Sequence, residues 1–149
     1  MNCRYAHTNI IAADWKRLAE FYETVFDCRS VPPRRNLSDE WLAEGTGIPN
    51  ASLEGVHLRL PGHGESGPTL EIYSYTEMEP RSATAPNRLG YGHLAFEVED
   101  VEAFRDAVLA HGGSDLGRTV EADVPGAGRL TFTYMADPEG NVIEIQNWT

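Results

Sequence analysis

Two histidines occupy matching positions in the two halves of the sequence. "YAHTNIIAAD" (5–14) and "YGHLAFEVED" (91–100) both place a Tyr two residues before a His and an Asp seven residues after it. Each stretch has the apolar, β-favouring composition of a strand. His7 and His93 are therefore expected at the start of two equivalent strands.

A glutamate recurs in the same way near the end of each half. Glu71 in "TLEIYSY" and Glu144 in "NVIEIQN" are both followed by Ile and flanked by apolar residues. A carboxylate in such surroundings should be protonated, ion-paired or bound to a metal. Taken singly, a His at a strand start is usually structural, and Glu144 alone would suit the surface of a sheet edge. The repetition favours a metal site with four ligands: His7, Glu71, His93 and Glu144.

Mixed nitrogen and oxygen ligation of this kind suits several divalent metals. Zn, Ni, Co, Mn and Fe(II) all accept imidazole and carboxylate ligands, and positions are left for water or substrate. The sequence therefore predicts one divalent metal ion per chain without identifying the metal.

Strand and helix signals in the first half must position the first pair. Asp14 is a helix N-cap, and apolar residues then recur at three- and four-residue spacing up to Phe26. Pro and Gly make 29–50 read as a long irregular stretch. The elements expected are a strand at 4–12, a helix at 14–26, a short helix around 38–44 and strands at 56–60 and 69–75.

The second half repeats this order after a linker. Residues 76–90 contain Pro, Gly and small polar residues without periodicity. The elements expected next are a strand at 91–99, a helix at 101–113 capped by Asp100, and strands at 116–123, 129–137 and 141–147. We therefore predict one domain, 1–149, that contains an internal repeat, with modules at about 1–75 and about 91–149.

Composition limits the partners. The 149 residues carry a formal net charge of −11, which disfavours nucleic acid and anionic membrane surfaces. No apolar run reaches membrane-spanning length, and the N-terminus lacks a signal-like segment, so a cytoplasmic location is expected. Cys3 and Cys28 are too few for a disulfide framework or a thiolate zinc site.

The second half resembles the vicinal oxygen chelate superfamily, which includes glyoxalase I, methylmalonyl-CoA epimerase, extradiol dioxygenases and bleomycin-resistance proteins. "YGHLAFEVEDVEAF", "HGG" and "ADPEGNVIEIQ" carry the resemblance, which extends over almost the whole chain. It implies an α+β fold of two tandem βαβββ modules, forming an open, cup-shaped mixed β-sheet around the metal. It also places the metal ligands at the four residues named above, and it implies a homodimer, as in many relatives.

The resemblance implies chemistry next to a carbonyl group. Extradiol dioxygenases use two His and one Glu, and bleomycin-type proteins usually lose the ligands, whereas this sequence keeps four. A small substrate bound through vicinal oxygens would lose and regain a proton, with Glu144 or Glu71 as the catalytic base. We therefore expect a metal-dependent isomerase, epimerase or lyase. The alternatives are glyoxalase I (lactoylglutathione lyase) and a non-catalytic, ligand-sequestering protein of the antibiotic-resistance type.

Candidate substrate-binding residues share strands with the first pair. His57 and Arg59 alternate with Val56 and Leu58, so they should share one strand face, and Arg59 would suit a carboxylate or phosphate. A solvated or ion-paired Arg59 is the alternative. Tyr73 and Tyr75 should point the same way as Glu71.

Two further features stay open on the sequence alone. Glu54, before "GV", is a further candidate base. The 34–50 segment is either a lid over the site or a dimer contact.

Overall fold

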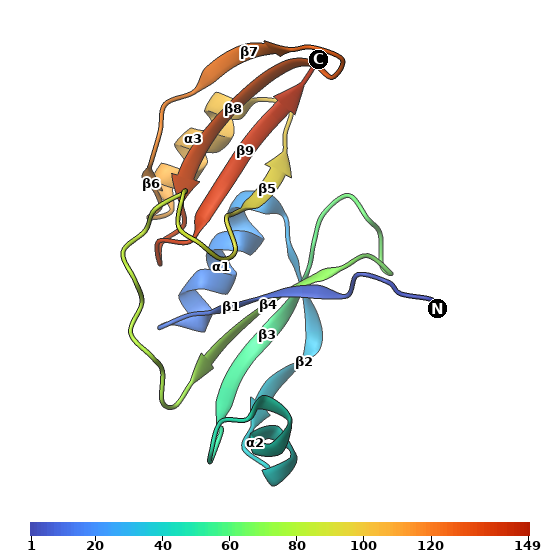
Figure 1. Cartoon of the computed structure of the whole chain (residues 1–149), viewed down its shortest axis with the longest axis vertical. Helices are drawn as coiled ribbons and strands as arrows, with labels where there is room; N and C mark the ends of the chain where they lie inside the picture. Colours follow the sequence, from blue (N-terminus) through green and yellow to red (C-terminus); the bar gives the residue numbers. More distant parts are fainter. The chain divides into compact units, whose positions relative to one another are not determined.

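The computed structural model describes residues 1–149, which divide into two compact units, Met1–Arg81 and Ser82–Thr149. The division falls within the 76–90 stretch that the sequence marks as a linker. Each unit contains its own mixed β-sheet and an α-helix packed on that sheet (Figure 1). The expected α+β class with two βαβββ-like modules is confirmed.

The first unit contains a four-stranded sheet with the order β1-β4-β3-β2. Strand β1 runs parallel to β4, and the other neighbours are antiparallel. The elements are β1 (His7–Ile11), α1 (Trp15–Phe26), β2 (Arg29–Leu37), α2 (Glu40–Thr46), β3 (Leu53–Arg59) and β4 (Thr69–Tyr75).

Helix α1 begins and ends where its sequence dictates. The Asp14 side chain accepts hydrogen bonds from the backbone N–H groups of Lys16 and Arg17, and Asp27 ends the helix in a left-handed conformation. The buried side includes Leu18 and Tyr22, and it packs on β3 and β4. Apolar residues of those strands, among them Val56, Leu58, Leu70 and Ile72, are buried there.

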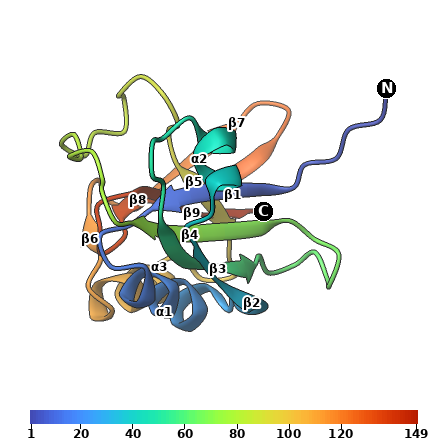
Figure 2. The ribbon, with the colours of Figure 1, turned by 90° about the horizontal axis from the view of Figure 1, so that it is seen from below.

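Helix α2 covers part of the other face of this sheet. Figure 2 shows α1 and α2 on opposite sides of the first sheet. Leu42 of α2 forms a small core with Ala51 and Leu53, against which Tyr73 and Tyr75 pack. The rest of that face carries the polar residues of the candidate site.

The expectation of an irregular 29–50 segment is wrong. Residues Arg29–Leu37 form β2, which pairs with β3 at the edge of the sheet, and α2 starts at Glu40, two residues later than expected. The register shifts between Val31 and Arg35, around two prolines. Proline is tolerated at sheet edges and bulges, so its presence did not exclude a strand.

The second unit repeats the arrangement. Its sheet has the order β5-β9-β8-β6, with β7 also paired to β8. Asp100 accepts a hydrogen bond from the Ala103 N–H at the start of α3, which packs on β8 and β9. The elements are β5 (Leu94–Glu97), α3 (Val101–Ala110), β6 (Ser114–Asp115), β7 (Val120–Val124), β8 (Gly128–Ala136) and β9 (Val142–Trp148).

Several bounds in the second unit differ from expectation, and the strand expected at 116–123 begins only at Val120, as β7. Strand β5 is shorter than the expected 91–99 strand, and α3 ends at Ala110 rather than at 113. The helix stops early because Gly112, with φ 89°, adopts a conformation that glycine favours. Every helix of the chain falls short of the length and apolar character needed to span a membrane.

Candidate metal and substrate site

The first unit brings two histidines to one carboxylate. Glu71 Oε1 lies 3.3 Å from His7 Nδ1 and 3.2 Å from His57 Nε2. Glu71 is only 7% exposed, although it is an acid on a sheet face. Because an unpartnered carboxylate is costly to bury, these two imidazoles explain how the position tolerates a glutamate.

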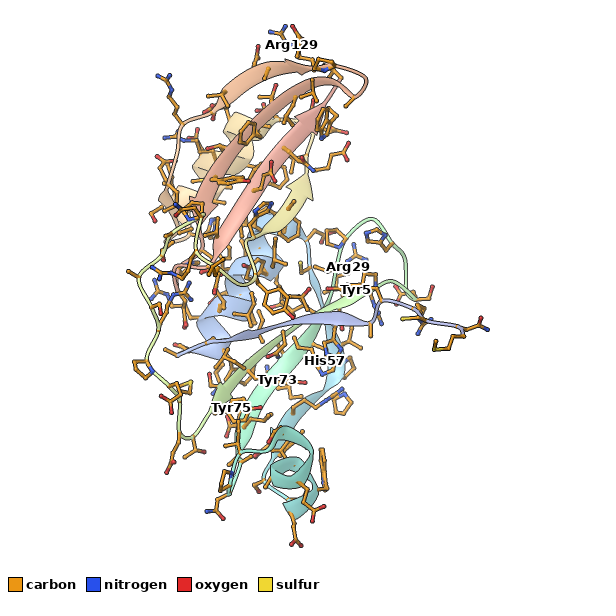
Figure 3. All side chains as sticks on the ribbon, in the orientation of Figure 1. Tyr5, Arg29, His57, Tyr73, Tyr75 and Arg129 are labelled. Carbon is orange, nitrogen blue, oxygen red and sulfur yellow. The ribbon has the colours of Figure 1, made fainter.

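Tyr73 extends this cluster along the sheet. Its hydroxyl lies 2.6 Å from His57 Nε2, and burial, followed by the charge of Glu71, raises its pKa. Gly55 stands opposite Tyr73 on β3, and a Cβ at Gly55 would lie 2.4 Å from Tyr73 Cδ1. The Tyr73 ring therefore packs directly over Gly55, where any larger residue would clash with it. Figure 3 shows His57, Tyr73 and Tyr75 following one another along this sheet.

The second unit forms a simpler pair. His93 Nε2 lies 2.9 Å from Glu144 Oε2. Tyr134 stands directly opposite Glu144 on β8, and its ring centroid is 4.9 Å from that of His93. Burial and the charge of Glu144 raise the Tyr134 pKa.

Sheet registers place the two pairs at equivalent positions. Asn9 of β1 pairs with Glu71, and Ala95 of β5 pairs with Glu144. His7 and His93 each stand two residues before the partner of the glutamate. The same comparison aligns His57, which is opposite Glu71, with Tyr134, which is opposite Glu144.

The other residues singled out from the sequence are distributed over both faces of the first sheet. Arg59 is half-buried on the His57 face, and one of its guanidinium nitrogens donates to the Gly67 carbonyl. Tyr75 packs beside α2 on that same face. Glu54 is exposed and alternates with Gly55 and His57, so it lies on the opposite face from Glu71. This placement removes Glu54 from the residues that could act together with Glu71.

Two residues near the pairs were missed by the sequence reasoning. Arg35 lies in β2, within the stretch that the sequence predicts to be irregular, and Tyr134 lies in β8, where the sequence predicts a strand but no site residue. If the two halves are aligned so that Glu144 matches Glu71, the strand that contains Tyr134 matches the strand "VHLRL". Tyr134 then falls at the position of His57. No comparable signal marks Arg35.

The donor atoms suit a divalent metal in type and spacing. Adjacent ligands around an ion with bonds of about 2.0 to 2.2 Å lie roughly 3.0 to 3.5 Å apart, and the His–Glu contacts of the two units measure 3.3, 3.2 and 2.9 Å. No group of three or more His, Cys, Asp or Glu side chains is arranged to hold a metal ion. Each unit by itself thus holds one cluster of histidine and glutamate side chains.

Comparisons with known proteins identify similar sequences and a similar fold. The chain is 28% identical over 150 residues to a probable lactoylglutathione lyase of Vibrio parahaemolyticus, covering 98% of this chain and 92% of that protein. A glyoxalase family protein from Bacillus cereus matches with a TM-score of 0.75 at 22% identity, covering 99% of this chain and 94% of that one.

A fosfomycin resistance protein from Listeria monocytogenes, solved with Mn(II) and sulfate, shares the fold. Its TM-score is 0.56 at 14% identity, covering 100% of this chain and 95% of that one. The family model for the glyoxalase-like domain matches residues 7–146, which include all four residues of the two His–Glu pairs. The chain therefore belongs to the glyoxalase-like domain family, within the glyoxalase, bleomycin resistance and dioxygenase superfamily.

Proposed function

We propose that the chain is a divalent-metal-dependent isomerase or epimerase, or a lyase of the glyoxalase type. It would move a proton next to a carbonyl of a small substrate that binds through neighbouring oxygens. The observation that carries this proposal is the repeated His–Glu pair, which occupies the same register position in both units. A single structural histidine or a single surface acid accounts less well for a pair that recurs in register.

The proposed ligands are His7 and Glu71 from the first unit and His93 and Glu144 from the second. Their imidazole and carboxylate donors fit Zn, Ni, Co, Mn or Fe. When bound, the metal would act as a Lewis acid and stabilise the negative charge that develops on the substrate oxygens.

Proton transfer is assigned to Glu144. Glu71 contacts two imidazoles through a single oxygen, whereas Glu144 contacts one. A carboxylate with fewer partners gives up less when it takes a proton, so Glu144 is the better base of the two. On the first unit, His57, Arg59, Tyr73 and Tyr75 would contact the substrate.

Lactoylglutathione lyase activity is the second candidate. The observation that favours it is the similarity to the Vibrio protein over nearly the full length of both chains. One residue argues against it. The first strand of bacterial glyoxalase I has a sequence like "HTMLRV", whose Arg helps to hold the glutathione carboxylate, and the matching position in this chain is Ile11 on β1. Turnover of the hemithioacetal of methylglyoxal and glutathione by the purified chain would favour this candidate over an epimerase.

Two further proposals are that the chain forms a homodimer and, as an alternative to catalysis, that it only sequesters a ligand. Each is tested by a separate experiment in solution. Light scattering reports the oligomeric state directly. A sequestering protein would bind its ligand without exchanging any proton of that ligand with solvent.

The test of the proposed function is solvent-deuterium exchange at carbon. The purified chain, with its metal content measured, is incubated in D₂O with 2-oxo and 2-hydroxycarbonyl compounds. Metal-dependent exchange into at least one compound is expected, and it should be lost on chelation and regained with metal. The exposed Glu97 of β5 offers a control, since Glu97→Gln should leave exchange unchanged.

A further inference from the structure

Two half-buried arginines on the first sheet lack acidic partners. The chain has 23 acidic and 12 basic residues, so a half-buried guanidinium would be expected to meet a carboxylate. Arg105, which is half-buried in the second unit, does so with Asp115 at 2.7 Å. Arg35 and Arg59, which are half-buried in the first unit, have no ion pair and donate only to backbone carbonyls.

Arg35 is aligned with Tyr73 of the candidate site by the register of the sheet. It stands opposite Gly55, which stands opposite Tyr73, so the three form one row across β2, β3 and β4. Residues paired in this way share a face of the sheet, and the central one has no side chain. The Tyr73 ring covers Gly55, since a Cβ there would lie 2.4 Å from Tyr73 Cδ1, and His57 follows two residues later on the same face.

The charge of Arg35 acts on both His57 and Tyr73. Burial lowers the pKa of His57, the charge of Glu71 opposes this, and the charge of Arg35 adds to the lowering. It also opposes the rise in the Tyr73 pKa. Glu71 is the one carboxylate that acts on both groups, and two imidazoles contact it.

We propose that Arg35, His57 and Tyr73 bind an anionic group, a carboxylate or a phosphate, on the first unit. That this group belongs to the substrate depends on the proposed function; the binding itself does not. The substrate class is then a carbonyl compound that carries a second, charged oxygen group besides the oxygens that meet the metal.

Each of the three side chains has a distinct part. The guanidinium of Arg35 supplies charge and a planar set of donors that matches a carboxylate or phosphate. The Tyr73 hydroxyl and His57 Nε2, which lie 2.6 Å apart, are the neighbouring polar groups that an anion held by Arg35 would contact. Arg59 is a second arginine on this face, and it donates to the Gly67 carbonyl as Arg35 donates to the Pro33 carbonyl.

Arg34 provides a matched control for Arg35. It is the adjacent residue on β2, but its guanidinium carbon lies 5.7 Å from the centroid of the Trp15 ring, which belongs to α1 on the other face. Arg34→Gln and Arg35→Gln remove the same charge from the same strand. General electrostatic attraction would make the two variants behave alike, whereas a site at Arg35 would not.

The experiment is an NMR titration of the full-length chain with pyruvate, with inorganic phosphate and with neutral methyl pyruvate. It is carried out on zinc-loaded protein and repeated after chelation. We expect pyruvate or phosphate to shift the Gly55 and Tyr73 amides and methyl pyruvate to leave them in place. The anion that binds better identifies the charged group as carboxylate or phosphate.

Arg35→Gln is expected to weaken anion binding roughly tenfold or more, the usual effect of losing a charge-assisted hydrogen bond. Arg35→Lys should restore part of the binding, and Arg34→Gln should leave it within about twofold of the wild type, since its charge lies on the other face. Circular dichroism checks that each variant is folded. Equal weakening by both glutamine variants, or binding by neither anion, would overturn the proposal. Persistence of Arg35-dependent binding after chelation would uphold it even if the metal-dependent reaction were absent.

Discussion

The two units use the same framework but place different residues opposite their glutamates. In the first unit, His57 stands opposite Glu71 and contacts it, and Tyr73 adds a hydroxyl. In the second unit, Tyr134 stands opposite Glu144, and one histidine contacts the carboxylate. One glutamate is held by a network and the other by a single partner. The repeat therefore holds its two glutamates through different numbers of side-chain contacts.

The largest expected effect comes from replacing Glu144, the proposed base. Glu144→Gln keeps a neutral oxygen donor but removes the base, so deuterium exchange at the substrate carbon should fall by a factor of about 10² to 10⁴. Glu71→Gln should have a smaller effect. Exchange is followed by mass spectrometry at matched metal content. If Glu71→Gln abolishes exchange while Glu144→Gln spares it, the roles of the two units are reversed.

Gly55 tests how closely the first network is packed. A Cβ at this position would lie 2.1 Å from the Ile72 carbonyl oxygen and 2.4 Å from Tyr73 Cδ1. Gly55→Ala should therefore lower the free energy of unfolding by about 1 to 3 kcal/mol, measured by urea denaturation. Gly45→Ala is the control, because nothing lies within 4 Å of that Cβ. A stable, unperturbed Gly55→Ala variant would mean that Tyr73 does not occupy this space.

Two tyrosine variants compare the units directly. Tyr73→Phe removes the hydroxyl that meets His57, so it should cost about 0.5 to 1.5 kcal/mol of unfolding free energy. Tyr134→Phe should cost less, since that hydroxyl has no hydrogen bond in its unit. Denaturation of both variants under identical conditions measures the difference. Equal losses would argue against a hydrogen-bonded network that is confined to the first unit.

The smallest effect concerns acid sensitivity. Burial and Arg35 lower the His57 pKa, so between about pH 6.5 and that lower pKa the unfolded chain binds a proton that the folded chain does not. Stability should then fall as the pH falls through this window. His57→Gln should remove that part of the pH dependence, as measured on chelator-treated protein. NMR titration of the His57 ring should show a pKa that rises in Arg35→Gln.

The sequence predicted those features that rest on repetition and periodicity. The capped helix at Trp15–Phe26, the strand at Thr69–Tyr75 and the equivalence of the two halves all follow from local patterns. Strand β2 was not predicted because prolines are typical of loops. They are nevertheless tolerated in a strand at the edge of a sheet. The contact between His57 and Tyr73 depends on the register of β3 with β4 and on the vacancy at Gly55, which no local pattern specifies.

Metal stoichiometry tests the central claim that the two His–Glu pairs supply the ligands of one ion. Elemental analysis of the purified chain is predicted to give about one divalent ion per chain, which dialysis against a chelator removes and divalent metal restores. His7→Ala and His93→Ala, one from each unit, should each lower the retained metal, whereas His63→Ala in the exposed β3–β4 turn should not. A chain that binds no divalent metal even after reconstitution, or that retains it in both His7→Ala and His93→Ala, would contradict the account.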